Sequence, residues 1–223
     1  DKVTFSPFNW TPPCVNRRRN SLLLGMYPSL TKSVVSSSGA MPNARGDSAC
    51  ERFFLPETSL IKEHQKTRTA LLSVETQRQL SDFSVIFVML SFEMDYDNLL
   101  TVLELGNIKL RAEQRNEKEP LIIIGGPCAT FNPEPLASVA DAFVIGEGEE
   151  TVQKILDTIY TNTSKEEKLL NLANLPGVYV PKYYTPQYDE DGEFTGMEYD
   201  ERVPAKITRQ WVKDIDAYPH TSA

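Results

Sequence analysis

The strongest constraint on the fold of this chain is a continuous apolar segment, SVIFVML, at residues 84–90. The segment is rich in β-branched residues and carries no charge, which is typical of a central parallel strand buried on both faces. Further strand candidates lie at 21–26, 50–55, 121–124 and 142–145. We therefore expect these segments to form strands of one sheet.

Segments with helical character separate these strands. They lie at 57–65, 97–108, 133–138 and 149–160, with weaker candidates for a helix at 30–38 and 75–80 and for a short strand at 71–74. Asp95 or Asp97 is a suitable N-cap for the second of these helices. The alternation suits right-handed βαβ crossovers. The sequence therefore predicts an α/β fold, a Rossmann-like doubly wound and mainly parallel sheet over residues 21–161.

The pattern changes after residue 161. Ser164 is a good N-cap for a helix that runs through Leu172. Strand-like segments follow at 177–181, 182–188, 193–199 and 205–211, and Asp189–Gly192 reads as a hairpin turn. We therefore expect residues 162–211 to form a small C-terminal appendage, a helix followed by antiparallel β structure. Residues 1–20 are expected to be an N-terminal extension, and 212–223 a linker.

The charge distribution disfavours nucleic acid as a partner of the whole chain. The net charge is −8, whereas phosphate contacts need clustered Lys and Arg. Residues 1–68 nevertheless carry ten Lys/Arg against five Asp/Glu, including Arg17, Arg18 and Arg19. A contact between RNA and this basic third is left open, beside the simpler reading of a solvated surface.

The sequence indicates a cytoplasmic protein. The longest apolar runs are too short to span a bilayer, and the N-terminus has no apolar signal region. The three cysteines, Cys14, Cys50 and Cys128, form no disulfide framework and no CxxxCxxC or zinc motif. We therefore assign no metal ligand and no catalytic residue within this chain.

Candidate ligand-binding residues lie where the expected strands end. Ligands of open α/β sheets bind beyond the carboxyl ends of the strands. Paired glycines at such a turn permit unusual φ angles and close approach by a ligand, although a tight packing turn explains them equally well. No GxGxxG or P-loop fingerprint is present. The candidate residues are Tyr27, Ser29, Ser91, Phe92, Glu93, Gly125, Gly126, Pro127, Gly146, Glu147 and Gly148.

Four segments in this order resemble the N-terminal cobalamin-binding-type domain of B12-binding-domain radical SAM proteins. They are CERFFLPE (50–57), DFSVIFVMLSFEMDYDNLL (82–100), PLIIIGGPCATFNPEPLA (120–137) and DAFVIGEGEET (141–151). The resemblance extends over roughly residues 22–218. It implies a Rossmann-like fold that leads into a radical SAM domain, which would follow near residue 223. The [4Fe-4S] cluster and S-adenosylmethionine are then expected only in that domain of the parent protein.

The resemblance also implies roles for the turns. In this family a DxHxxG motif after the first strand supplies the lower axial histidine of cobalamin, while a Ser-containing turn and a GG turn embrace its nucleotide tail. Ser91 and Gly125–Gly126 occupy the matching positions. The histidine motif is missing, because the only histidines are His64 and His220. A bound corrinoid would need another lower ligand, water, or none.

Two functions follow as hypotheses. The first is an accessory domain of a radical SAM enzyme that positions a corrinoid or retains a remnant of that site, and is not catalytic by itself. The second is a degenerate scaffold that binds no cofactor and docks the radical SAM domain, a protein partner or RNA. A free-standing nucleotide-binding protein is a weaker alternative, because the phosphate fingerprint is absent.

Overall fold

The computed structural model describes residues 21–25 and 47–214 of the 223-residue chain. The extension at 1–20, the helix expected at 30–38 and two candidate site residues, Tyr27 and Ser29, lie outside the described residues.

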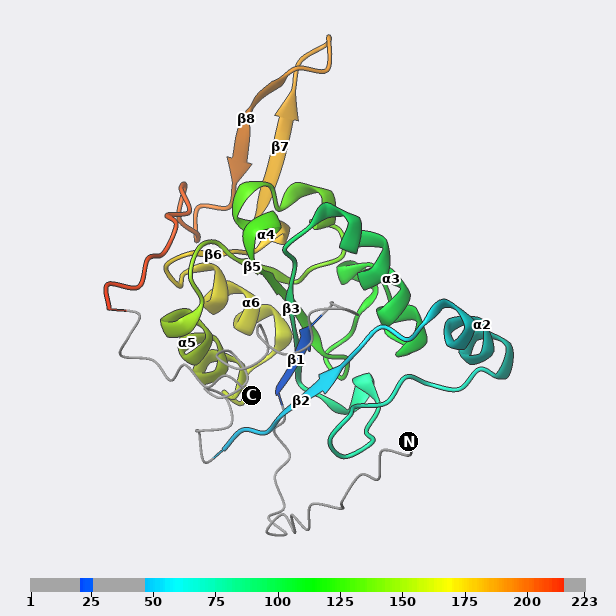
Figure 1. The fold of residues 1–223 in the computed structure, drawn as a ribbon. Coiled ribbons are helices and arrows are strands. Elements are labelled where there is room, and N and C mark those ends of the chain that lie inside the picture. The colour runs from blue at the N-terminus through cyan, green and yellow to red at the C-terminus, as the bar shows by residue number, and fades with distance from the viewer. Residues whose placement is uncertain (1–20, 26–46, 215–223) are drawn as a thin grey trace.

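A six-stranded sheet forms the centre of the molecule (Figure 1). Its order is β2-β1-β3-β4-β5-β6; the first five strands are parallel and β6 is antiparallel to β5. The first five follow the doubly wound 2-1-3-4-5 order, in which ligands bind where the order reverses, between β1 and β3. The predicted α/β fold with a mainly parallel sheet is confirmed. The bounds are β1 Ser21–Gly25, β2 Cys50–Phe53, β3 Val85–Met89, β4 Leu121–Gly125, β5 Ala142–Val144 and β6 Val178–Tyr179.

The apolar segments occupy the middle of the sheet because helices cover both of its faces. Residues 85–88 and 121–124 are buried throughout, and β3 and β4 pair in register from Val85 and Leu121 onward. Burying each such side chain contributes about 1.5–3 kcal/mol. Figure 1 shows α3 on one side of the sheet and the pair α5 and α6 on the other. The helices are α2 Thr58–Thr67, α3 Tyr96–Leu105, α4 Pro127–Phe131, α5 Glu149–Ile159 and α6 Lys165–Ala173.

Before residue 161, three local predictions differ from the structure. The helix expected at 133–138 is a single 3₁₀ turn, Glu134–Leu136, whereas the short helix α4 directly after β4 was not predicted. Residues 75–80 form no helix, since Gln77 has a left-handed φ of 58°, which interrupts helical hydrogen bonding. The strand expected at 71–74 amounts to one isolated bridge, between Leu72 and Gln79.

The C-terminal part divides between the main sheet and a separate hairpin. The Ser164 hydroxyl caps α6 as predicted, accepting the Glu167 N–H at 3.2 Å. Strand β6 joins the main sheet, because its apolar side chains are buried against β5. The two-stranded sheet consists of β7 (Tyr184–Tyr188) and β8 (Phe194–Tyr199), and it projects from the body in Figure 1. Residues 205–211 form no strand and contribute only an isolated bridge.

Candidate functional site

The glycine turn after β4 is locked to the end of β3. The Leu90 N–H donates to the Gly125 carbonyl at 2.9 Å, and the Cys128 N–H donates to the Leu90 carbonyl at 3.2 Å. Gly126 has a φ of +97°, and a Cβ there would lie 2.6 Å from the Leu90 carbonyl oxygen. Close backbone packing therefore accounts for Gly126 without a ligand. Pro127 follows it, exposed, as the first residue of α4.

Three exposed apolar side chains lie in the segments that follow β3 and β4. Phe92 is 57% exposed and Met94 is 87% exposed, both just after β3, and Phe131 at the end of α4 is 83% exposed. We call Phe92, Met94 and Phe131 the apolar ledge. Ser91 is half-buried beside it and Glu93 is exposed. Met94 and Phe131 were not among the residues predicted from the sequence, because an apolar residue type by itself predicts burial.

The ledge borders a neutral thiol. Burial raises the pKa of the Cys128 thiol, and the neighbouring Glu93 carboxylate raises it further. Tyr96 hydrogen-bonds to this thiol, and burial raises the pKa of the Tyr96 hydroxyl as well. Cys128 is therefore a buried, protonated side chain at neutral pH, and an unsuitable nucleophile.

The acidic residues after β3 act in local structure. Asp95 is buried and stands at the N-cap position of α3, yet its carboxylate accepts the Asn98 side-chain amide at 3.0 Å and caps no helix N–H. Asp97 lies in the first turn of α3, where a negative charge favours the helix.

The turn after β5 is covered by the chain itself. Gly146 has a φ of +104°, and a Cβ there would lie 2.3 Å from the Gln210 carbonyl oxygen. The Gln210 N–H donates to the Ile145 carbonyl at 3.0 Å, and the Glu147 N–H donates to the Gln210 carbonyl at 3.1 Å. The Glu147 carboxylate accepts the Val212 N–H. We call residues 209–212 the closing segment.

The structure therefore separates the candidate residues into two groups. Residues 91–93 and 125–127 meet at neighbouring strand ends, and Phe92 of this group belongs to the ledge. Residues 146 and 147 are engaged by the closing segment, and Gly148 is the N-cap residue of α5. The Gly146 N–H also donates to the Thr130 hydroxyl at 3.1 Å, which ties the second group to α4.

Comparison with known families identifies the chain. Residues 40–181 match the profile of a family described as radical SAM proteins, N-terminal. The chain belongs to this family of radical SAM N-terminal regions. It is also similar to the uncharacterized protein MJ0966 of Methanocaldococcus jannaschii, with 23% identity over 130 residues. The matched region is 57% of this chain and 28% of that relative, so the chain spans under a third of its length.

This radical SAM N-terminal region holds no ligand set for an iron–sulfur cluster among its described residues. No group of three or more His, Cys, Asp or Glu side chains that could hold a metal occurs there. The described cysteines, Cys50 and Cys128, lie on different elements. None of the described helices is long and apolar enough to cross a membrane.

The described residues of this edge offer a corrinoid no protein imidazole. No histidine stands among the described residues after β3, β4 or β5. His64 lies on α2, where its Nδ1 is 2.8 Å from the Thr69 carbonyl oxygen. The ledge offers apolar contact to a large planar ligand, but the edge offers no ring nitrogen to its metal.

Proposed function

We propose that this chain is the accessory domain of a radical SAM enzyme, and that the edge formed by residues 91–93 and 125–127 positions a corrinoid there. The apolar ledge carries this proposal. Three large apolar side chains stand exposed beyond the carboxyl ends of β3 and β4, next to the switch point at which doubly wound sheets bind ligands. Exposed apolar patches of this kind mark binding surfaces.

The residues of the edge would bind and orient the cofactor. Phe92, Met94 and Phe131 would pack against one face of the macrocycle and exclude water from it. The Ser91 hydroxyl would hydrogen-bond to a polar substituent of the ligand. A corrinoid bound there supplies the transfer of a methyl group or an electron. The described residues of this edge include no histidine, so they would offer the cofactor apolar contact and the Ser91 hydroxyl but no ring nitrogen.

A second function, a scaffold that docks the radical SAM domain without a cofactor, is favoured by the two glycine turns. Gly126 is required by its contact with the Leu90 carbonyl, and Gly146 by its contact with the closing segment. Both glycines therefore have structural reasons to be present. In this case the ledge would be covered by protein.

A visible-absorbance titration with hydroxocobalamin and methylcobalamin tests the first function. The edge variant is Phe131→Glu, which places a charge on the ledge. The matched control is Leu60→Glu on α2, where the exposed leucine lies away from the edge. Gly126 is unsuitable for substitution, because any Cβ there strikes backbone.

We expect a saturable, base-off spectral change that is retained by Leu60→Glu and at least roughly tenfold weaker in Phe131→Glu. Equal binding by both variants would contradict the proposed edge. A folded chain without any spectral change would favour the docking scaffold. The same titration on a longer natural protein that includes the radical SAM domain then tells whether that domain completes the site.

A further inference from the structure

A groove of about 840 Å³ lies beside β6, β7 and α6. It is bordered by the 3₁₀ turns Ala112–Gln114 and Glu134–Leu136, by α6, and by β6 and β7. None of the candidate residues after β3, β4 or β5 lines it. Grooves of roughly 300–1,000 Å³ are those in which proteins bind small molecules.

One wall of the groove is aromatic and apolar. The rings of Tyr179 and Tyr184 lie 5.1 Å apart between centroids. Both hydroxyls are engaged, since Tyr179 donates to Glu134 Oε1 at 2.6 Å and Tyr184 donates to the Pro204 carbonyl at 2.7 Å. Burial, followed by this bond to Glu134, raises the pKa of Tyr179, which keeps its hydroxyl protonated. Small and apolar side chains complete the lining: Ala112, Ala137, Ala140, Leu169, Pro181 and Pro186.

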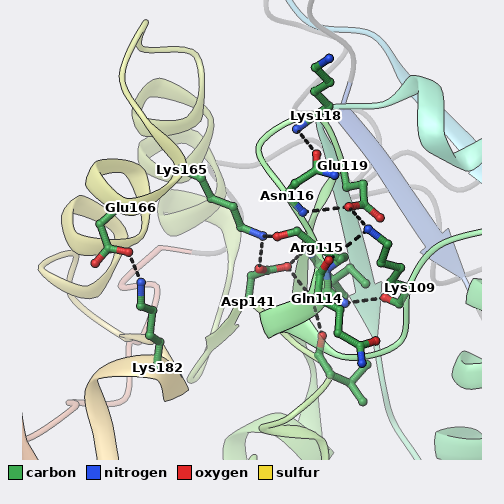
Figure 2. Close-up of polar contacts among 12 residues, drawn as sticks. Lys109, Gln114, Arg115, Asn116, Lys118, Glu119, Asp141, Lys165, Glu166 and Lys182 are labelled. Carbon is green, nitrogen blue, oxygen red and sulfur yellow. Dashed lines mark hydrogen bonds and ion pairs between the residues drawn. The ribbon is translucent and has the colours of Figure 1, made fainter.

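Arg115, Asp141 and Lys165 form a cluster at the polar end of the groove that holds two cations and one carboxylate (Figure 2). Asp141 is buried between two cations. Its Oδ2 lies 2.7 Å from Arg115 Nη2, and its Oδ1 lies 3.1 Å from Lys165 Nζ. A single carboxylate therefore faces a guanidinium and an ammonium group, and the cluster favours a second anion.

The same cluster lacks hydrogen-bond acceptors. The Arg115 side chain is 0% exposed and donates to the carbonyls of Lys109, Leu110 and Val139. Its Nε–H is buried and has no acceptor among the described residues. The Lys165 ammonium makes two described contacts, to Asp141 and to the Arg115 carbonyl, of the three it can make. The Lys165 side chain is 15% exposed and lines the groove, so its third N–H is open to an acceptor on a ligand, whereas the Arg115 Nε–H is enclosed by protein.

The rim limits the ligand to one negative charge. Lys182 is already paired with Glu166, which also accepts the Tyr183 hydroxyl. The rim also carries the exposed carboxylates of Glu113, Glu117 and Glu134 against one further cation, Arg111. A phosphate dianion would be repelled by these groups more strongly than a carboxylate.

We propose that this groove binds a small organic carboxylate with an aromatic or aliphatic body. The carboxylate accepts from Lys165 and balances the charge of Arg115. The body of the ligand packs on the rings of Tyr179 and Tyr184 and over Ala137. The inference does not rest on corrinoid binding, because the two sites share no residue.

Saturation-transfer difference NMR tests the proposal on the full chain. The probes are phenylacetate, 3-phenylpropionate and 4-phenylbutyrate, each compared with its uncharged amide and with phenyl phosphate. Lys165→Gln removes the charge, and Ala137→Leu fills the groove while leaving the charged cluster intact. Lys154→Gln, an exposed lysine on α5, is the matched control.

We expect at least one carboxylate to bind saturably and its amide to bind roughly tenfold more weakly, because a charge-assisted hydrogen bond is lost. Ala137→Leu and Lys165→Gln should each bind the carboxylate roughly tenfold more weakly or worse, while Lys154→Gln should bind it as the wild type does. Circular dichroism establishes that each variant is folded. The proposal is overturned if a folded chain binds none of the three carboxylates, if the amide binds equally well, or if Ala137→Leu binds normally. Tighter binding of phenyl phosphate overturns the assignment to a carboxylate.

Discussion

The substitution Asp141→Asn should destabilise the fold strongly. The Asp141 carboxylate is buried, contacts Arg115 and Lys165, and also accepts the Ile122 N–H of β4 at 2.8 Å. The side-chain oxygen of the introduced asparagine can still accept this N–H, so the change removes charge while keeping the backbone bond. It leaves the guanidinium of Arg115 buried without a counter-charge.

Breaking a buried ion pair in this way costs about 3–5 kcal/mol of unfolding free energy. For a chain of this size that corresponds to a melting temperature lowered by about 6–20 °C. Urea denaturation followed by circular dichroism measures the free energy, and a thermal scan measures the shift. The m-value should stay unchanged, because the surface exposed on unfolding is the same.

Glu119→Gln is the matched control for this prediction. Glu119 also pairs with a lysine, at 2.9 Å from Lys109 Nζ, and accepts one backbone N–H, from Asn116 at 2.8 Å. The Lys109 side chain is 49% exposed, so this pair contributes less than about 1 kcal/mol. Equal losses in the two variants would refute the argument that burial of the Arg115 cluster sets the size of the effect.

Three further predictions concern the turn, the hairpin base and the thiol. Gly126→Ala should lower the unfolding free energy by at least about 1–3 kcal/mol, because Gly126 has a φ of +97° and an added Cβ would meet the backbone of Leu90. Gly125→Ala should change it by less than about 1 kcal/mol, because an added Cβ would lie 3.7 Å from the Val144 Cβ. Urea denaturation measures both. The Asp200 carboxyl should titrate near its pKa of about 2 in an NMR pH titration, because Arg202 hydrogen-bonds to it, and Arg202→Gln should raise that pKa toward 3.8. Cys128 should react slowly with a thiol reagent at pH 7 and faster as pH rises, because burial raises its pKa.

Each of these has a clear contrary result. Equal stability of the two alanine variants would contradict the steric argument for Gly126. Because the pKa of Asp200 is lowered, its contribution to stability is present above its ordinary pKa of 3.8 and is lost as pH falls toward 2. A titration midpoint of Asp200 near 3.8 in the wild type would contradict the Arg202 contact. Rapid, pH-independent labelling of Cys128 would contradict its burial.

The local sequence predicted the parallel strands and most helices. Residues 85–88 and 121–124 are apolar and buried at every position, as expected of strands covered on both faces. The cap at Ser164 was also predicted, since its hydrogen bond to Glu167 lies within one helical turn. The helix expected at 75–80 does not form, because Gln77 adopts a left-handed φ. The residue types of this segment do not predict that φ.

The candidate site was predicted only in part. Strand ends can be placed from sequence, so residues 91–93 and 125–127 could be named together in advance. The exposure of Met94 and Phe131 could not, because apolar composition by itself predicts burial. Tyr27 and Ser29 remain predictions, as do the domain boundaries.

The sequence by itself determined the alternating strands and helices and the glycine turns, because periodicity, capping and φ preference act within a few residues. Only the tertiary structure decided that β6 adds to the main sheet and that the closing segment covers Gly146. It also assembled Arg115, Asp141 and Lys165 into one cluster. The contact from Lys165 to the Arg115 carbonyl joins residues 50 positions apart. Such contacts depend on how elements pack in three dimensions, and no local pattern in the sequence encodes them.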